Sequence, residues 1–271
     1  MRSRWIAMAC TLAGFALKGQ APNTAQTSAP IDITGYWVAL VTEDWRYRML
    51  NAPKGDYYSI PLNAEAKRVA DTWDPAKDIA AGNQCLSYGA PNIMREPARL
   101  HIAWANDSTL KIEIDAGKQT RQFWFGPVTP PAEPTMQGTS MAVWQTPQSI
   151  RAQTSKISAQ DPNTPGFRDA SMASPPPPPD MRRLGGTLKV VTTHIKPGYL
   201  RNNGVPFSAN AVLTEYYDVH KRGKDEYLVQ TQIVDDPKYL NAPWVVSSHY
   251  RREPDGSKWD PQACELLLPS K

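Results

Sequence analysis

The chain has 271 residues, 41% of them hydrophobic, and a formal net charge of +4. This length is enough to bury a full core in one or two domains. Three of the positive charges precede residue 20, and without them the net charge is 4 − 3 = +1. A nearly neutral chain offers no broad field for nucleic acid or anionic lipid, so both classes of partner are excluded.

The N-terminus reads as a signal peptide over residues 1–26. Arg2 and Arg4 precede an apolar run from Trp5 to Leu17, which is shorter than the roughly 20 residues needed to span a bilayer. No later stretch is long and apolar enough to serve as a transmembrane segment. We therefore expect a periplasmic or secreted protein whose folded part begins at Ile31.

The first half of the chain alternates between strand and helix patterns. Residues 35–41 and the alternating segment 45–49 each predict a strand. Apolar residues at helical spacing predict a helix over 62–73. Asp74 and Pro75 are typical of a helix N-terminus, and Gly82 would end this second short helix.

The second half is dominated by strands. Alternation and turn residues predict a three-stranded meander over 99–125 and a further strand at 140–145. Residues 146–183 contain a run of prolines and few core formers, so we expect a disordered loop there. Four more strands are predicted at 187–195, 211–219, 227–234 and 244–251.

These nine or ten strands with one short helical insertion predict a single mostly β domain over residues 31–271. Antiparallel meanders of this size close into a barrel or pack as a sandwich. We expect a lipocalin-like barrel, with a β-sandwich as the alternative. Of the two cysteines left after export, Cys85 and Cys264, a disulfide is the simplest prediction, and two separate buried thiols are the alternative.

Some segments resemble known proteins. Gly35-Tyr36-Trp37 resembles the Gly-x-Trp opening of lipocalin-type (calycin) barrels. The segments 35–49, 53–57, 198–206 and 235–240 are similar to those of a group of exported bacterial proteins of unassigned function. The resemblance implies export and a single fold, and it implies no particular chemistry.

Motifs for common chemistries are missing from the sequence. It has no P-loop, no GxGxxG after a strand, no GxSxG and no HExxH, so no cofactor is predicted. Neither cysteine has a CxxC partner or a nearby histidine, and no metal is predicted. The remaining catalytic candidates are polar residues on strand faces, where a histidine and a carboxylate could exchange protons inside a barrel: His194, Glu215 and His249. The alternative is that these side chains face outward.

Charged and aromatic loops give a second set of candidates, because the mouths of barrels bind ligands with such loops. Arg46 or Arg201 could hold a carboxylate through two hydrogen bonds. The alternative is a structural role in turns and local ion pairs. The candidate ligand-binding residues are Trp45, Arg46, Tyr57, Tyr199, Arg201, Tyr217 and Tyr239.

Three hypotheses for function remain open. The first is binding of a small, largely apolar or aromatic metabolite in the barrel cavity. The second is an enzyme, a lyase, isomerase or hydratase that uses a His/Glu acid–base pair in the same cavity. The third is an envelope accessory protein that acts through protein–protein contacts. The side chains that line the barrel interior should discriminate among them.

Overall fold

The computed structural model describes residues 24–147, 149 and 185–266. Most of the predicted signal peptide (1–26) and of the predicted disordered loop (146–183) lies outside the described residues. Within the described ranges, no helix has the length and apolar character needed to cross a membrane.

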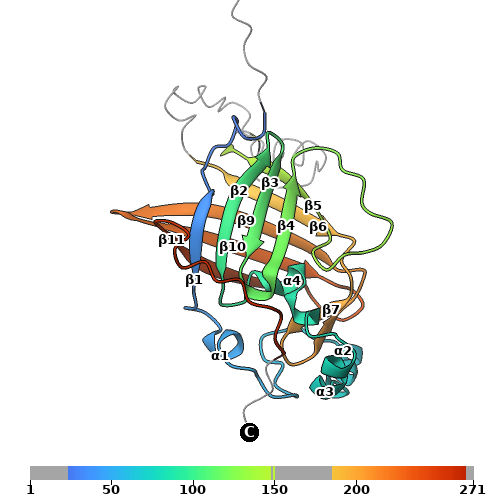
Figure 1. Ribbon diagram of the computed structural model, residues 1–271. Coiled ribbons are helices and arrows are strands. Elements are labelled where there is room, and N and C mark those ends of the chain that lie inside the picture. The colour runs from blue at the N-terminus through green and yellow to red at the C-terminus, as the bar shows by residue number, and fades with distance from the viewer. Residues whose placement is uncertain (1–23, 148, 150–184, 267–271) are drawn as a thin grey trace, which may run out of the picture.

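Nine strands close into a barrel (Figure 1). They are β1 (Gly35–Leu40), β2 (Arg99–Asn106), β3 (Thr109–Ile114), β4 (Gln119–Trp124), β5 (Thr139–Gln145), β6 (Thr187–Thr193), β9 (Val212–Arg222), β10 (Asp225–Asp235) and β11 (Trp244–Glu253). Neighbours in the chain pair with each other, and β11 returns to pair with β1. The predicted mostly β barrel is confirmed, and the sandwich alternative is wrong.

The barrel contains one parallel pair, β4 with β5. A closed ring with an odd number of strands cannot alternate direction at every step, so one pair of neighbours must run the same way. Here Phe123 pairs with Ser140 and Trp124 with Met141, while the other barrel pairs are antiparallel. The connection at 125–138 carries the chain back toward the start of β4, where the carbonyl of Met136 accepts a hydrogen bond from Ala90.

Strand side chains alternate between the barrel interior and the outer surface, as a pleated strand requires. On β9, Leu213, Glu215 and Tyr217 are buried, whereas Thr214 and Tyr216 between them are partly exposed. Inward apolar side chains from around the ring form one continuous core. The interior is filled by side chains, among them Trp37, Leu100, Ile112, Phe123, Leu188, Tyr217 and Tyr250.

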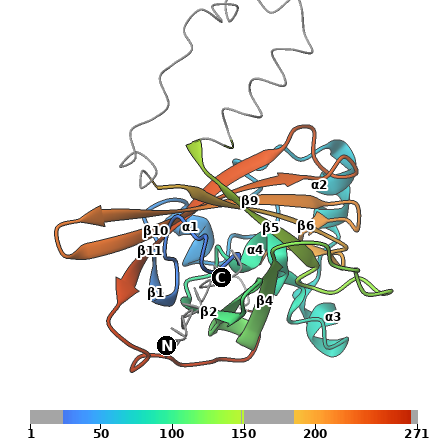
Figure 2. The same ribbon diagram turned by 90° about the horizontal axis from the view of Figure 1, so that it is seen from above.

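Short helices and a small hairpin lie at one end of the barrel, here called the base (Figure 1). The opposite end is called the mouth, and the long β9–β10 hairpin projects beyond the barrel wall in both ribbon views (Figures 1 and 2). The basal elements are α1 (Trp45–Arg48), α2 (Ala64–Asp71), α3 (Pro75–Ala80), η1 (Leu86–Tyr88), α4 (Ala90–Ile93), η2 (Ala116–Lys118), β7 (Gly198–Arg201) and β8 (Val205–Phe207).

Both predicted helices are present, and α2 begins two residues later than predicted. The side chain of Asn63 accepts from Ala66 at the start of α2, and Asp74 accepts from Ala76 at the start of α3. Gly204 in the β7–β8 turn packs on Trp73, which follows α2. A Cβ at position 204 would lie 2.1 Å from the Trp73 ring, and φ there is +79°, so only glycine fits.

The predicted strand at 45–49 is wrong, because this segment forms helix α1. Asp44 adopts the left-handed conformation, with φ 50°, and turns the chain out of β1. Its carbonyl then accepts from the backbone N–H groups of Tyr47 and Arg48 at 2.8 and 3.1 Å. Alternation over five residues cannot be distinguished from one helical turn, and this turn directs the Arg48 side chain into the protein.

A disulfide joins Cys85 and Cys264, as predicted. The two residues are 179 positions apart, and the bond attaches the C-terminal segment (254–266) to the segment after α3. Such a bond fits an oxidising compartment.

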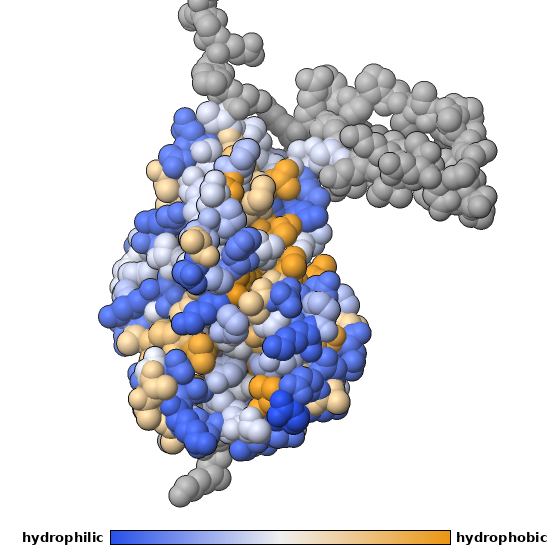
Figure 3. Space-filling model, turned by 90° about the vertical axis from the view of Figure 1, so that its right-hand side faces the viewer, coloured by the Kyte–Doolittle hydropathy of each residue, from blue (hydrophilic) through white to orange (hydrophobic). Residues whose placement is uncertain are grey.

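The N-terminal segment is ordered earlier than Ile31, the predicted start. Trp144 Nε1 donates to the carbonyl of Ala25 at 2.8 Å, and the amide of Gln26 donates to the carbonyl of Asp107 at 3.1 Å. Residues 24–33 therefore run across the mouth of the barrel. The face of the molecule shown in Figure 3 is mainly polar, with hydrophobic side chains between the polar ones.

Candidate functional site

Two segments rich in charged and aromatic residues, 53–59 and 199–204, meet at the base of the barrel. Asn203 in the β7–β8 turn donates to the carbonyls of Pro53 and Asp56 at 3.2 and 3.0 Å. Arg201 donates to Ser59 Oγ at 3.0 Å. Segments far apart in the sequence thus build one polar region beneath the barrel.

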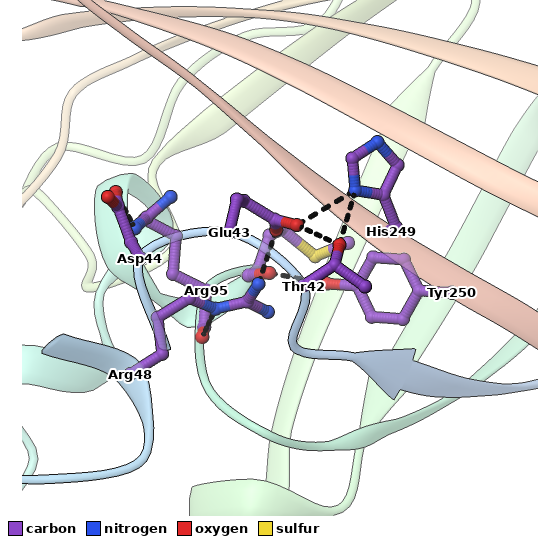
Figure 4. Close-up of polar contacts among 8 residues, drawn as sticks. Thr42, Glu43, Asp44, Arg48, Arg95, His249 and Tyr250 are labelled. Atoms are coloured by element: carbon purple, nitrogen blue, oxygen red, sulfur yellow. Dashed lines mark hydrogen bonds and ion pairs between the residues drawn. The ribbon is translucent and has the colours of Figure 1, made fainter. Parts of the chain in front are cut away.

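Glu43, just after β1, links a histidine to a buried arginine (Figure 4). Its Oε2 accepts from Thr42 Oγ1 at 2.6 Å and lies 2.9 Å from His249 Nδ1, while Oε1 pairs with Arg48. Burial raises the pKa of Glu43, but the hydrogen bonds from Thr42 and His249 and the charge of Arg48 outweigh it, so the pKa is lowered. Glu43 is therefore a carboxylate with two basic partners.

Two further arginines, Arg95 and Arg201, contact the segment that contains Glu43 and Arg48. Arg95 Nη2 donates to Asp44 Oδ2 at 2.7 Å, and the backbone carbonyl of Arg95 accepts from Arg48 Nε at 2.7 Å (Figure 4). Arg201 lies over the Tyr47 ring, with 4.0 Å between the guanidinium carbon and the ring centroid. These three residues, Arg48, Arg95 and Arg201, are named the basal arginine cluster, and all three are buried.

A pocket of about 360 Å³ opens beside this cluster. Glu96 borders it and is buried, with Oε1 accepting from Asn92 at 2.7 Å and from Asn202 at 3.4 Å. Burial raises the pKa of Glu96 to about 7, against the opposing hydrogen bonds of the two asparagines. We call this hollow the basal pocket. Its wall includes Arg48, Tyr88, Glu96, Arg99, Asp115 and Asn202.

Inside the barrel, Glu215 faces the interior, as predicted, on the same side as Leu213 and Tyr217. Its partner is Arg121 on β4, which donates to both carboxylate oxygens at 2.7 and 2.5 Å. Gln230 and the Tyr217 hydroxyl also donate to Glu215. Glu215 and Arg121 are fully buried, so the pair lies inside the filled core and away from the basal pocket.

The predicted pairing of Glu215 with His249 is wrong, because His249 lies on the other face of its strand. Tyr250 and Ser248 on β11 are buried, and His249 between them is partly exposed beside Glu43. His194 does not face the interior either. It lies just after β6 with φ 54° and is exposed.

The predicted ligand-binding residues divide into four groups. Arg201 lies in the arginine cluster, and Tyr217 lies in the barrel core. Trp45 is exposed and Tyr239 partly exposed. Local acids hold the others at the base: Arg46 pairs with Asp56 at 2.8 Å, the Tyr57 hydroxyl donates to Asp71 at 2.7 Å, and the Tyr199 hydroxyl donates to Asp78 at 2.8 Å.

Sequence reasoning missed Arg48, Arg95, Glu96 and Arg121. Arg121 could have been found from the sequence, because it lies two residues before Phe123 on a strand and so shares the apolar face of Phe123. The others follow turns or short helices, where periodicity gives no direction. In the described ranges, no three or more His, Cys, Asp or Glu side chains are grouped so that they could hold a metal ion.

Comparisons with protein-family models, curated proteins and solved structures found no match. The fold therefore defines the class of the protein, a closed nine-stranded barrel with a helical base. The similarity to exported bacterial proteins of unassigned function stays a prediction.

Proposed function

We propose that this is an exported binding protein that takes a small polar metabolite in its basal pocket. The observation that carries the proposal is Glu96, a buried carboxyl with a pKa raised to about 7 on the wall of an open pocket. Strongly perturbed groups in concave sites are more frequent at functional sites than elsewhere. A pocket of about 360 Å³ also lies within the range of small-molecule sites.

The composition of the pocket supports a polar ligand. Arg99 supplies hydrogen-bond donors, while Asp115, Asp260 and Glu265 supply carboxylates. Such a wall matches a ligand with both donor and acceptor groups better than a purely apolar one. The disulfide supports export, because such bonds persist in oxidising compartments.

The opposite end of the barrel supports a second candidate function, binding of the apolar or aromatic metabolite expected from the sequence. Phe125 lies between Trp104 and Trp144, with ring centroids 5.4 and 5.3 Å away. The two tryptophans also border a hollow of about 380 Å³ beside the N-terminal segment. The enzyme and protein-partner hypotheses stay predictions.

The first experiment blocks the basal pocket. Ala263 is exposed on the C-terminal segment and lines the pocket, so Ala263→Trp should fill the pocket without disturbing the core. Ala132→Trp places the same ring on an exposed loop away from the pocket and is the matched control. A melting-temperature screen of polar and aromatic metabolites on the wild type should identify ligands, and calorimetry on both variants then locates them.

We expect the affinity for polar ligands to fall at least tenfold in Ala263→Trp and to be unchanged in Ala132→Trp. Equal affinity in the wild type and in Ala263→Trp would contradict the proposal. If the ligands found are aromatic and bind Ala263→Trp normally, the site at the mouth is supported in its place.

A further inference from the structure

The basal arginine cluster contains more hydrogen-bond donors than the described part of the chain can satisfy. Arg48, Arg95 and Arg201 are each at least nine-tenths buried. Several of their nitrogens are inaccessible and have no acceptor among the described residues, and the indole nitrogen of Trp244 shares this property. The unpartnered donor atoms are Arg48 Nη2, Arg95 Nη1, Arg201 Nε, Arg201 Nη1 and Trp244 Nε1.

Buried donors without acceptors are costly, and charged ones most of all. Native proteins keep few of them. A group of such donors in one region is therefore evidence that acceptor atoms belong there.

The cluster also has an excess of charge. Arg48 pairs with Glu43 and Arg95 pairs with Asp44. Arg201 forms no ion pair with any described carboxylate; its single hydrogen bond in this region is to Ser59. The ion pairs join three guanidinium groups to two carboxylates, and the nearby Glu96 is protonated below its raised pKa of about 7. Below that pH one positive charge is left, which a monoanion would balance.

Aromatic rings fix the two arginines that carry most of the free donors. Arg201 stacks on Tyr47 at 4.0 Å, and Arg95 lies over the Trp244 ring at 5.3 Å. Burial and the charge of Arg95 lower the pKa of Arg201 to about 10. These ring contacts restrict the movement of both guanidinium groups.

We infer that the basal arginine cluster is an anion subsite that binds a carboxylate group of the ligand. The inference rests on the proposed function, because Arg48 and Asn202, the neighbour of Arg201, also form part of the pocket wall. A carboxylate supplies two acceptor oxygens and one negative charge, which matches the free donors and the excess charge.

The test uses Arg201→Met with Arg68→Met as a matched control, because Arg68 is largely exposed and pairs with Glu65. Melting temperatures are measured in low salt and then with sodium acetate or sodium chloride at equal ionic strength. Acetate at about 100 times its Kd should raise the melting temperature of the wild type and of Arg68→Met by roughly 5–10 °C more than chloride. Arg201→Met should lose this difference.

If Arg201 had a purely structural role, Arg201→Met would melt below the wild type in low salt. On the proposal, the variant removes an uncompensated buried charge, so its melting temperature in low salt should equal that of the wild type or exceed it. If Arg201→Met melts well below the wild type in low salt, or if acetate and chloride act alike on the wild type, the inference is overturned.

The two proposals can fail separately. If metabolites bind the basal pocket of the wild type and of Arg201→Met with equal affinity, the proposed function holds and the anion subsite is wrong. An acetate effect that depends on Arg201, with no metabolite sensitive to Ala263→Trp, would leave the subsite without the pocket function.

Discussion

Glu96→Gln should stabilise the protein above pH 7 and have little effect near pH 4.5. Glutamine resembles the protonated carboxyl in shape and keeps the oxygen that accepts from Asn92 at 2.7 Å. The change therefore removes the ability to ionise while leaving the local hydrogen bond in place.

The magnitude follows from the pKa. Burial raises the pKa of Glu96 from 4.5 to about 7 in the folded protein. Between these values the folded state holds a proton that the unfolded state has released, so the wild type loses stability as the pH rises through this window. Each pKa unit corresponds to about 1.4 kcal/mol, so the loss is about 3 kcal/mol above pH 7. Glu96→Gln has no such loss.

The assay is urea unfolding of the wild type and the variant at pH 5, 6, 7 and 8, with free energies from linear extrapolation. Other titrating groups contribute to both proteins and cancel in the difference; Asp115, whose pKa is also raised by burial, is one of them. Glu133→Gln, on the exposed loop between β4 and β5, is the control and should show no pH-dependent difference of this size. A difference between wild type and Glu96→Gln that stays constant from pH 5 to pH 8 would refute the reasoning.

Three other changes test the scaffold by the same unfolding measurement. Cys85→Ser should cost about 2–5 kcal/mol, because the bond to Cys264 closes a long loop in the unfolded chain; a loss under about 1 kcal/mol would contradict this. Glu215→Ala should cost about 3–5 kcal/mol by leaving Arg121 buried without its carboxylate, and the double variant Arg121→Met/Glu215→Leu should recover most of that. His249→Ala should cost less than about 1 kcal/mol, because its pair with Glu43 is partly exposed; a larger loss would mean that this pair holds the base together.

The strands of the barrel could be predicted because their signal is local. Alternation along the meander of β2, β3 and β4 indicates both the strands and their buried face. Apolar spacing located α2, and the capping residue Asp74 located α3. Helix α1 and the β7–β8 hairpin were missed, because three or four residues are too few to show a repeated helix or strand pattern.

The prediction that His249 faces the interior was wrong because it assigned the inward face of β11 to the wrong set of alternate residues. Two faces of β11 were available, one with Val245 and His249 and one with Trp244 and Tyr250. The larger aromatic residues take the interior, and their size was a signal in the sequence. The pairing of Glu215 with Arg121, 94 residues away, depends on closure of the ring, which no local pattern encodes. The basal cluster depends in the same way on how loops meet in space.

The parallel contact between β4 and β5 has a consequence for how the barrel opens. This seam holds two paired positions, whereas β9 and β10 pair along their whole length. Local opening follows the segments with the fewest mutual hydrogen bonds. Amide protons flanking the seam should therefore exchange with solvent before those of the β9–β10 ladder, and β4 and β5 should be the first neighbouring strands to separate. A solute that reaches the filled interior should enter between β4 and β5. The disulfide keeps the C-terminal segment attached to the base during such opening.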